Sequence, residues 1–168
     1  MSVVLDLTRD PQADERPLKS QYLTSLKIVE RLHRLLLDVV KNEFERVGRT
    51  DVNSVQALLL YNIGDCELTA GEIRTRGYYL GSNVSYNLKK LVDNGYIHHQ
   101  RSKTDRRSVR VRLTPKGKEV YGVVNVLFER QLTMIEKVAG LTVPDLKTLN
   151  QSLARLERFW IDQIRYRL

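Results

Sequence analysis

The feature that most constrains the fold of this chain is a short alternating segment, VRVRL, that lies between two stretches of helical periodicity. Val109, Val111 and Leu113 occupy every second position, which is the period of a β-strand with one buried face. The preceding run, residues 96–101, supplies a partner strand, and Asp105 then falls near the tip of the turn. The sequence therefore predicts a β-hairpin with an apolar inner face and a cationic outer face.

This hairpin lies within the segment that carries the chain's excess positive charge. Residues 89–118 hold ten Lys or Arg and two Asp, whereas the other 138 residues hold 18 basic and 18 acidic side chains, so the formal net charge of +8 lies in one segment. Such a patch attracts a polyanion through Coulomb steering and counterion release. Nucleic acid is the first candidate partner and an anionic membrane surface the second. A solvated edge hairpin that blocks aggregation is the remaining interpretation.

Helical periodicity and capping residues predict six helices around the hairpin. Five of them begin at a residue that can cap a helix: Asn53, Thr69, Ser82, Thr114 and Thr142. The expected helices are residues 18–47, 53–63, 69–76, 82–93, 114–138 and a sixth that begins at residue 142. A tight pair of short helices followed by a hairpin is the order of a winged helix-turn-helix. We expect a mainly α fold with a small β-hairpin wing.

The chain divides into three regions by composition and pattern. Residues 1–17 contain two prolines and several charges and are expected to form an N-terminal arm. Residues 51–114 form the winged helix-turn-helix, between long helical regions at 18–50 and 115–168.

No segment has the pattern of a secretory signal or the length of a membrane span. The single Cys66 fits a reducing cytoplasm, so we expect a cytoplasmic protein that associates with the nucleoid through DNA and not with a membrane.

The helix that begins at residue 82 carries the pattern of a helix that reads DNA. Its amino terminus offers free N–H groups to a phosphate, and an α-helix fits the major groove, which is about 12 Å wide. Val84, Leu88 and Leu91 face inward, while hydroxyl and amide groups face outward to base edges and two lysines reach flanking phosphates. Tyr86 either faces the bases or lies half-buried against the wing. The expected contacts on this helix are Ser82, Asn83, Ser85, Tyr86, Lys89 and Lys90.

The hairpin extends the same surface along the duplex. An arginine at its tip can enter the minor groove, whose negative potential attracts a guanidinium group, and Asp105 can hold a neighbouring arginine in a bidentate pair. The same pair with Arg107 would also shape the turn in a protein of any function. The expected contacts on the hairpin are Arg101, Lys103, Asp105, Arg106, Arg107 and Arg110.

The sequence contains no pattern that indicates catalysis or metal binding. His33, His98 and His99 do not form a metal-ligand spacing with Cys66 or with paired carboxylates. The nine glycines read as caps and turns rather than as a phosphate loop, and no nucleophile–base pair is evident. We therefore expect no enzymatic activity, no metal and no cofactor. Cys66 is interpreted as a packing residue, with redox sensing as the alternative.

Two segments resemble a known family of transcription regulators. The run DRRSVRVRLTPKG, residues 105–117, resembles the wing signature of the MarR family, and LKKLVDNGYI, residues 88–97, resembles the end of that family's recognition helix. The order of the flanking helices extends the resemblance over residues 18–168. The segment from residue 77 to residue 113 is also similar to the L,D-transpeptidase regulator subgroup.

The resemblance implies a homodimer, assembled through the helical regions 18–50 and 115–168, that binds pseudo-palindromic double-stranded DNA. It assigns Asp105 as the anchoring acid of the wing, Arg107 as the minor-groove arginine and Arg106 as a phosphate or second groove contact. It also implies a cleft that accepts a small aromatic or phenolic effector. The rings expected to line that cleft are Phe44, Tyr61 and Tyr121.

Two features depart from the family pattern. The first long helix lacks the reactive cysteine of the peroxide-sensing branch, and the turn RGYYLGS is rich in tyrosine. The sequence thus predicts a sequence-specific, dimeric transcriptional regulator. A low-specificity architectural DNA-binding protein and a winged-helix protein-interaction adaptor are the rival interpretations.

Overall fold

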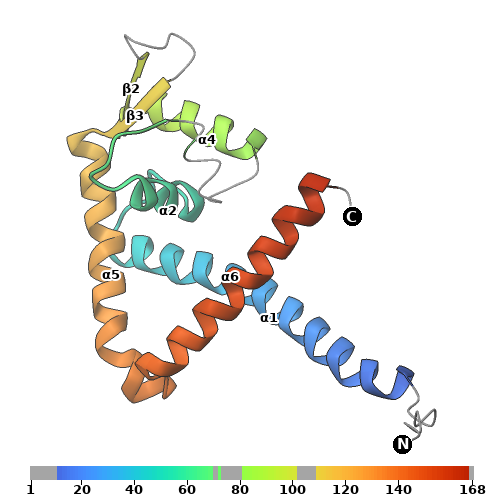
Figure 1. The fold of residues 1–168 in the computed structure, drawn as a ribbon. Helices are drawn as coiled ribbons and strands as arrows, with labels where there is room; N and C mark the ends of the chain where they lie inside the picture. The colour runs from blue at the N-terminus through green and yellow to red at the C-terminus, as the bar shows by residue number, and fades with distance from the viewer. Residues whose placement is uncertain (1–10, 70–71, 73–80, 102–108, 167–168) are drawn as a thin grey trace, which may run out of the picture. The chain divides into compact units, whose positions relative to one another are not determined.

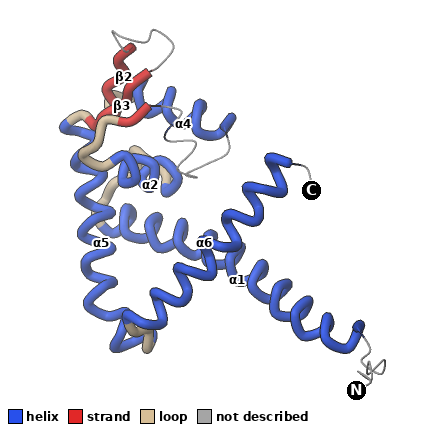
Figure 2. Tube along the Cα trace, viewed as in Figure 1, coloured by secondary structure: helices blue, strands red, loops and turns tan. Residues whose placement is uncertain are grey.

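A computed structural model of the chain describes residues 11–69, 72, 81–101 and 109–166 (Figure 1). Its residues form two compact units, Met1–Tyr121 and Gly122–Leu168. The first unit contains helices, a small sheet and the start of helix α5, whereas the second contains the rest of α5 and helix α6 (Figure 2). The expected class, mainly α with a small β wing, is confirmed.

Helix α1, Pro11–Arg46, begins earlier than its apolar pattern indicates. The predicted start at about residue 18 is wrong because the preceding segment, QADER, has no apolar stripe but is made largely of good helix formers. Pro11 occupies the first helical position, where its missing N–H costs little. The helix therefore extends into the segment expected to be an arm, while residues 1–10 lie outside the described part.

Helix α2, Ser54–Ile63, begins at the expected capping box. The Gln56 N–H donates to Asn53 Oδ1 at 2.9 Å, and the Asn53 N–H donates to Gln56 Oε1 at 3.2 Å. The two side chains thereby satisfy backbone donors that the first turn leaves without helical partners. The helix is buried over most of its circumference, with Leu59 and Leu60 wholly inaccessible. It packs against α1 and strand β3 and forms the centre of the first unit.

Three short strands form one antiparallel sheet in the order β1-β3-β2. Strand β2, Ile97–Arg101, pairs with β3, Val109–Leu113, which confirms the predicted hairpin. The inner face of β3 is buried at Val111 and Leu113, as the alternation predicts. The sequence did not reveal β1, Leu68–Thr69, because two residues are too few to show a period. The expected turn residues, 102–108, lie outside the described part.

Helix α4, Gly81–Asp93, packs on β2 through an apolar face. Leu88 and Leu91 are buried, as predicted, whereas the side chain of Val84 lies outside the described part. The helix starts at Gly81, so Ser82 lies inside its first turn and not at the expected capping position. Ahead of it, the Thr69 and Glu72 side chains accept each other's backbone N–H, as a capping box should, but the short helix expected there lies largely outside the described residues.

The two carboxy-terminal helices are α5, Pro115–Ala139, and α6, Val143–Tyr166. Both begin at the predicted caps: the Thr114 hydroxyl accepts the Gly117 N–H at 3.1 Å, and the Thr142 N–H donates to Asp145 at 2.9 Å. Helix α6 has no buried residue in the described part of the chain, although its apolar side chains repeat every three or four positions. No described helix is long and apolar enough to span a bilayer.

Candidate nucleic-acid interface

Helix α4 presents a polar face opposite its buried leucines. Ser85, Lys89 and Lys90 are exposed on this face, and Tyr86 is 58% exposed. Tyr86 is therefore not half-buried against the wing, which was one of its two interpretations. The Lys90 ammonium group lies 4.8 Å from the centre of the Tyr86 ring, so the two side chains form a cation–π pair one helical turn apart.

For the first turn of α4, the structure describes the backbone but not the side chains. Ser82 and Asn83 lie in the helix, but their side chains are outside the described part. A helix start leaves backbone N–H groups without helical partners, and these suit a phosphate. The candidate interface on α4 is thus built from backbone donors at one end, with hydroxyl, phenol and ammonium groups following.

The outer face of the sheet adds positive charge beside α4. Arg110 and Arg112 are exposed on β3 and lie opposite Gln100 and His98 of β2. Arg110 lies 3.8 Å from Glu67, an acid just before β1 that the sequence did not connect with the hairpin. Both partners are about half exposed, so the pair orients Arg110 without removing it from solvent.

The remaining expected wing contacts are only partly placed. Arg101 ends β2 opposite Val109 of β3, and its side chain is outside the described part. Lys103, Asp105, Arg106 and Arg107 all fall in residues 102–108, which are also outside it. The described strands therefore fix where the hairpin starts and returns.

A cavity of about 380 Å³ lies between one side of α4 and strands β2 and β3. Its floor is apolar, from Leu88, Val92 and Val111, and Lys89 and His99 are among the polar residues that line it. Lys89 is exposed and lines this cavity, so it lies on the side of the polar face that is nearer to the sheet. A ligand in this space would contact Lys89, which the sequence predicts to contact a phosphate.

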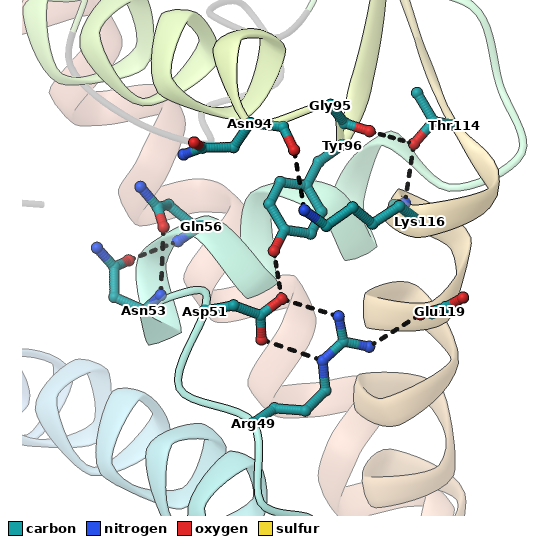
Figure 3. A network of polar contacts seen from close by, with 11 residues as sticks. Arg49, Asp51, Asn53, Gln56, Asn94, Gly95, Tyr96, Thr114, Lys116 and Glu119 are labelled. Carbon is teal, nitrogen blue, oxygen red and sulfur yellow. Dashed lines mark hydrogen bonds and ion pairs between the residues drawn. The ribbon is translucent and has the colours of Figure 1, made fainter.

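A network of polar side chains lies behind the interface, at the end of α4 (Figure 3). The Tyr96 hydroxyl donates to Asp51, which the Arg49 guanidinium also holds through two hydrogen bonds of 3.2 and 2.9 Å. Arg49 reaches Glu119 of α5 at 3.4 Å. Because of the bond from Arg49, the pKa of Asp51 lies well below its usual range. Burial and the bond to Asp51 raise the pKa of Tyr96 to about 12.

The residue that caps α5, Thr114, also forms hydrogen bonds with the backbone around Tyr96. The Thr114 hydroxyl donates to the Gly95 carbonyl at 2.7 Å, and the Thr114 N–H donates to the Tyr96 carbonyl at 3.0 Å. Gly117 lies so close to that carbonyl that an added Cβ would collide with its oxygen. The sequence indicated neither contact, because nothing local connects residue 96 with residues 114–117.

The residues expected to line an effector cleft lie in two places. Tyr61 of α2 stacks on Tyr121 of α5, with ring centres 5.2 Å apart and planes inclined by 16°. Phe44 of α1 is 4% exposed and lines a cavity of about 240 Å³ together with Arg49 and Val52. The structure therefore brings two of the three rings together.

Cys66 is exposed, so its interpretation as a packing residue is wrong. It follows α2 in a turn whose neighbouring acids, Asp65 and Glu67, pair with Lys118 and Arg110. Among the residues with described positions, no three His, Cys, Asp or Glu side chains form a group that could hold a metal ion.

Comparison with known proteins identifies the fold and the class of function. The family model for a winged helix DNA-binding domain matches residues 52–117. The transcriptional activator of exopolysaccharide II synthesis ExpG, from Rhizobium meliloti strain 1021, is 35% identical over 148 residues, which cover 86% of this chain and 74% of the relative.

Solved structures share the fold at lower identity. SlyA superposes with a TM-score of 0.70 at 18% identity, covering 85% of this chain and 98% of that one. Staphylococcus aureus MarR, solved with salicylate and kanamycin, superposes with a TM-score of 0.65 at 20% identity, covering 90% and 97%. The chain belongs to the MarR family of winged-helix transcriptional regulators. The prediction from the wing signature is confirmed, whereas the L,D-transpeptidase regulator subgroup stays a prediction.

Within this MarR-family chain, α4 occupies the place of the recognition helix, and β2 and β3 occupy the place of the wing. The matched winged-helix region ends at Gly117, just inside α5. Helices α1 and α6 and all but the first residues of α5 therefore lie outside the matched DNA-binding module.

Proposed function

We propose that this regulator binds a pseudo-palindromic operator as a homodimer, with α4 in the major groove and the wing in the adjacent minor groove. The observation that carries the proposal is the two-sided character of α4. Leu88 and Leu91 are buried, while Ser85, Tyr86 and Lys89 are exposed on the opposite face. A helix that only packed on the sheet would gain nothing from a hydroxyl and a phenol in this position.

The side chains on α4 and the wing divide into two roles. Ser82, Asn83, Ser85 and Tyr86 approach base edges and the first phosphate, where donors and acceptors discriminate sequence. Lys89 and Lys90 contact phosphates, which strengthens binding to every sequence. On the wing, Arg107 enters the minor groove and Asp105 holds it in place. Its other proposed contacts are Arg101, Lys103, Arg106 and Arg110.

The proposal of a homodimer is supported by apolar surface on the long helices. Leu149 and Leu153 of α6 are exposed, as are Leu32 and Leu35 of α1. Exposed leucines that repeat along helices mark an interaction surface, since they gain by leaving water. Deletion of residues 142–168 should abolish the dimer and tight operator binding. A truncated protein that sediments as a dimer and keeps its affinity for DNA would contradict this.

We also propose that a small aromatic or phenolic ligand weakens DNA binding. The S. aureus MarR structure, solved with salicylate, supports this class of ligand, and the Tyr61–Tyr121 stack offers ring surface between α2 and α5. The coupling between ligand and DNA should be about 1–3 kcal/mol. A screen of weak aromatic acids and phenols in which no compound changes both melting and DNA affinity would exclude a sensor role.

The experiment that tests DNA recognition is selection of bound sequences from a random duplex pool. We expect enrichment of one pseudo-palindrome, bound about 10³-fold or more tightly than scrambled DNA at physiological salt. Binding without enrichment would instead indicate an architectural protein. Failure to bind any duplex at low salt would indicate an adaptor for an acidic protein.

A further inference from the structure

The turn that ends α4 is held by the first residues of α5 at three successive backbone carbonyls. Lys116 Nζ donates to the Asn94 carbonyl at 3.0 Å, and Thr114 donates to the Gly95 and Tyr96 carbonyls through its hydroxyl and its N–H. Lys116 Nζ also lies 4.2 Å from the centre of the Tyr96 ring. The end of α4 is therefore held at the start of α5 through the backbone carbonyls of its turn.

The Tyr96 side chain extends this attachment to the loop between α1 and α2. Tyr96 is 1% exposed, and its hydroxyl donates to Asp51. Arg49 holds Asp51 and reaches Glu119, so the contacts close a ring from α4 through the loop to α5 (Figure 3). All of these residues lie in the first compact unit.

The phenol hydroxyl is not needed to fill this space. A phenylalanine would bury the same ring, and Arg49 would still hold Asp51. The hydrogen bond from Tyr96 to Asp51 is partly exposed, and it contributes little net stability because its two partners give up bonds to water, but it fixes the geometry of both. The hydroxyl therefore serves to orient the turn at the end of α4 relative to the loop that contains Asp51.

We propose that Tyr96 is a positioning residue that sets the spacing between the two recognition helices of the dimer. The proposal rests on the homodimer proposed above. A helix of 13 residues is about 20 Å long. A swing of about 10° at the turn containing Tyr96 would displace the far end of α4 by about 3.4 Å, the rise of one base pair. A bond that limits such a swing fixes which half-site spacing the dimer accepts.

The test compares Tyr96→Phe with the wild-type protein on operators of different spacing. The probes are the selected operator, the same operator with one base pair inserted or removed between its half-sites, and a single half-site. Asp65→Asn, at an acid that is 77% exposed and lies outside the Tyr96 network, is the matched control. Asp51→Asn is a second variant that disturbs the same network from the loop.

We expect the wild-type protein and Asp65→Asn to lose about tenfold or more in affinity on either altered spacing. Tyr96→Phe should lose about threefold or less in affinity on either altered spacing, and its affinity for a single half-site should be unchanged within about twofold. Asp51→Asn should likewise discriminate less between the spacings than the wild-type protein does. A purely structural role would lower binding to every probe alike.

Two results would overturn the proposal, and they are distinguishable. If the wild-type protein discriminates spacing and both network variants discriminate equally well, the positioning role is wrong while the homodimer stands. If the wild-type protein binds a single half-site as tightly as the full operator, the homodimeric mode of binding fails, and the positioning role fails with it.

Discussion

Replacement of Gly117 by alanine should destabilise the protein, although alanine is the better helix former. Gly117 lies in the first turn of α5, where an added Cβ would approach the Tyr96 carbonyl oxygen more closely than the 3.0 Å that real Cβ atoms keep. The added atom would also contact Leu113 at 3.4 Å. Both neighbours belong to the hairpin and its entry, so the helix and the wing would have to separate.

The change in the free energy of unfolding follows from two unfavourable contributions and one favourable contribution. Overpacking costs about 1–3 kcal/mol. Displacement of the Tyr96 carbonyl weakens its 3.0 Å bond from the Thr114 N–H, which is worth about 1 kcal/mol. Helix propensity returns about 1 kcal/mol when glycine becomes alanine. The net loss of stability should therefore be about 1–3 kcal/mol.

Urea unfolding at one fixed protein concentration measures this difference. Gly122→Ala is the matched control, because Gly122 lies in the same helix and its added Cβ would meet no described atom within 4 Å. Gly122→Ala should be neutral or up to about 1 kcal/mol more stable. If Gly117→Ala proves as stable as Gly122→Ala, the close approach of α5 to the Tyr96 turn is wrong.

Three further predictions concern titration and capping. Because the pKa of Tyr96 is raised to about 12, its contribution to stability is fully present below pH 10 and falls between pH 10 and 12 as the unfolded phenol ionises. Tyr96→Phe should remove about 1–3 kcal/mol of that loss, and the late-titrating part of the phenolate absorbance that belongs to Tyr96 should disappear in this variant. Thr142→Ala should cost about 1 kcal/mol of the free energy of unfolding, measured in urea, because it removes the hydroxyl that accepts the Asp145 N–H at the start of α6. The hydrogen bonds from Thr142 lower the pKa of Asp145, so the contribution of Asp145 to stability should be present above about pH 4 and disappear as the pH falls. Asp145→Asn should therefore reduce the loss of stability at acid pH, measured by urea unfolding at several pH values.

Local chemistry in the sequence predicted most of the elements. Asn53, Thr114 and Thr142 begin helices as capping residues should, since the partners that satisfy each cap lie within three positions. The buried face of α4 was predicted from the spacing of Val84, Leu88 and Leu91, and Leu88 and Leu91 are buried. Features that depend on neighbours along the chain were therefore accessible without coordinates.

Features that depend on distant neighbours were not accessible. Tyr96 and Asp51 are 45 positions apart, and neither residue type signals the other. Strand β1 is defined only by its pairing with β3, since its two residues carry no period. The start of α1 escaped prediction for another reason: residues 12–16 favour a helix by propensity, but their sequence has no apolar periodicity that would reveal it.

The most direct test of the account separates base contacts from phosphate contacts on α4. The measurement is the affinity of the wild-type protein, Ser85→Ala and Lys89→Ala for the selected operator and for scrambled duplex over a range of salt. Ser85→Ala should cost about 1–3 kcal/mol on the operator and little on scrambled DNA. Lys89→Ala should weaken both alike and lower the salt slope by about one ion. Equal losses on both duplexes from both variants would contradict the assignment of α4 as the helix that reads sequence.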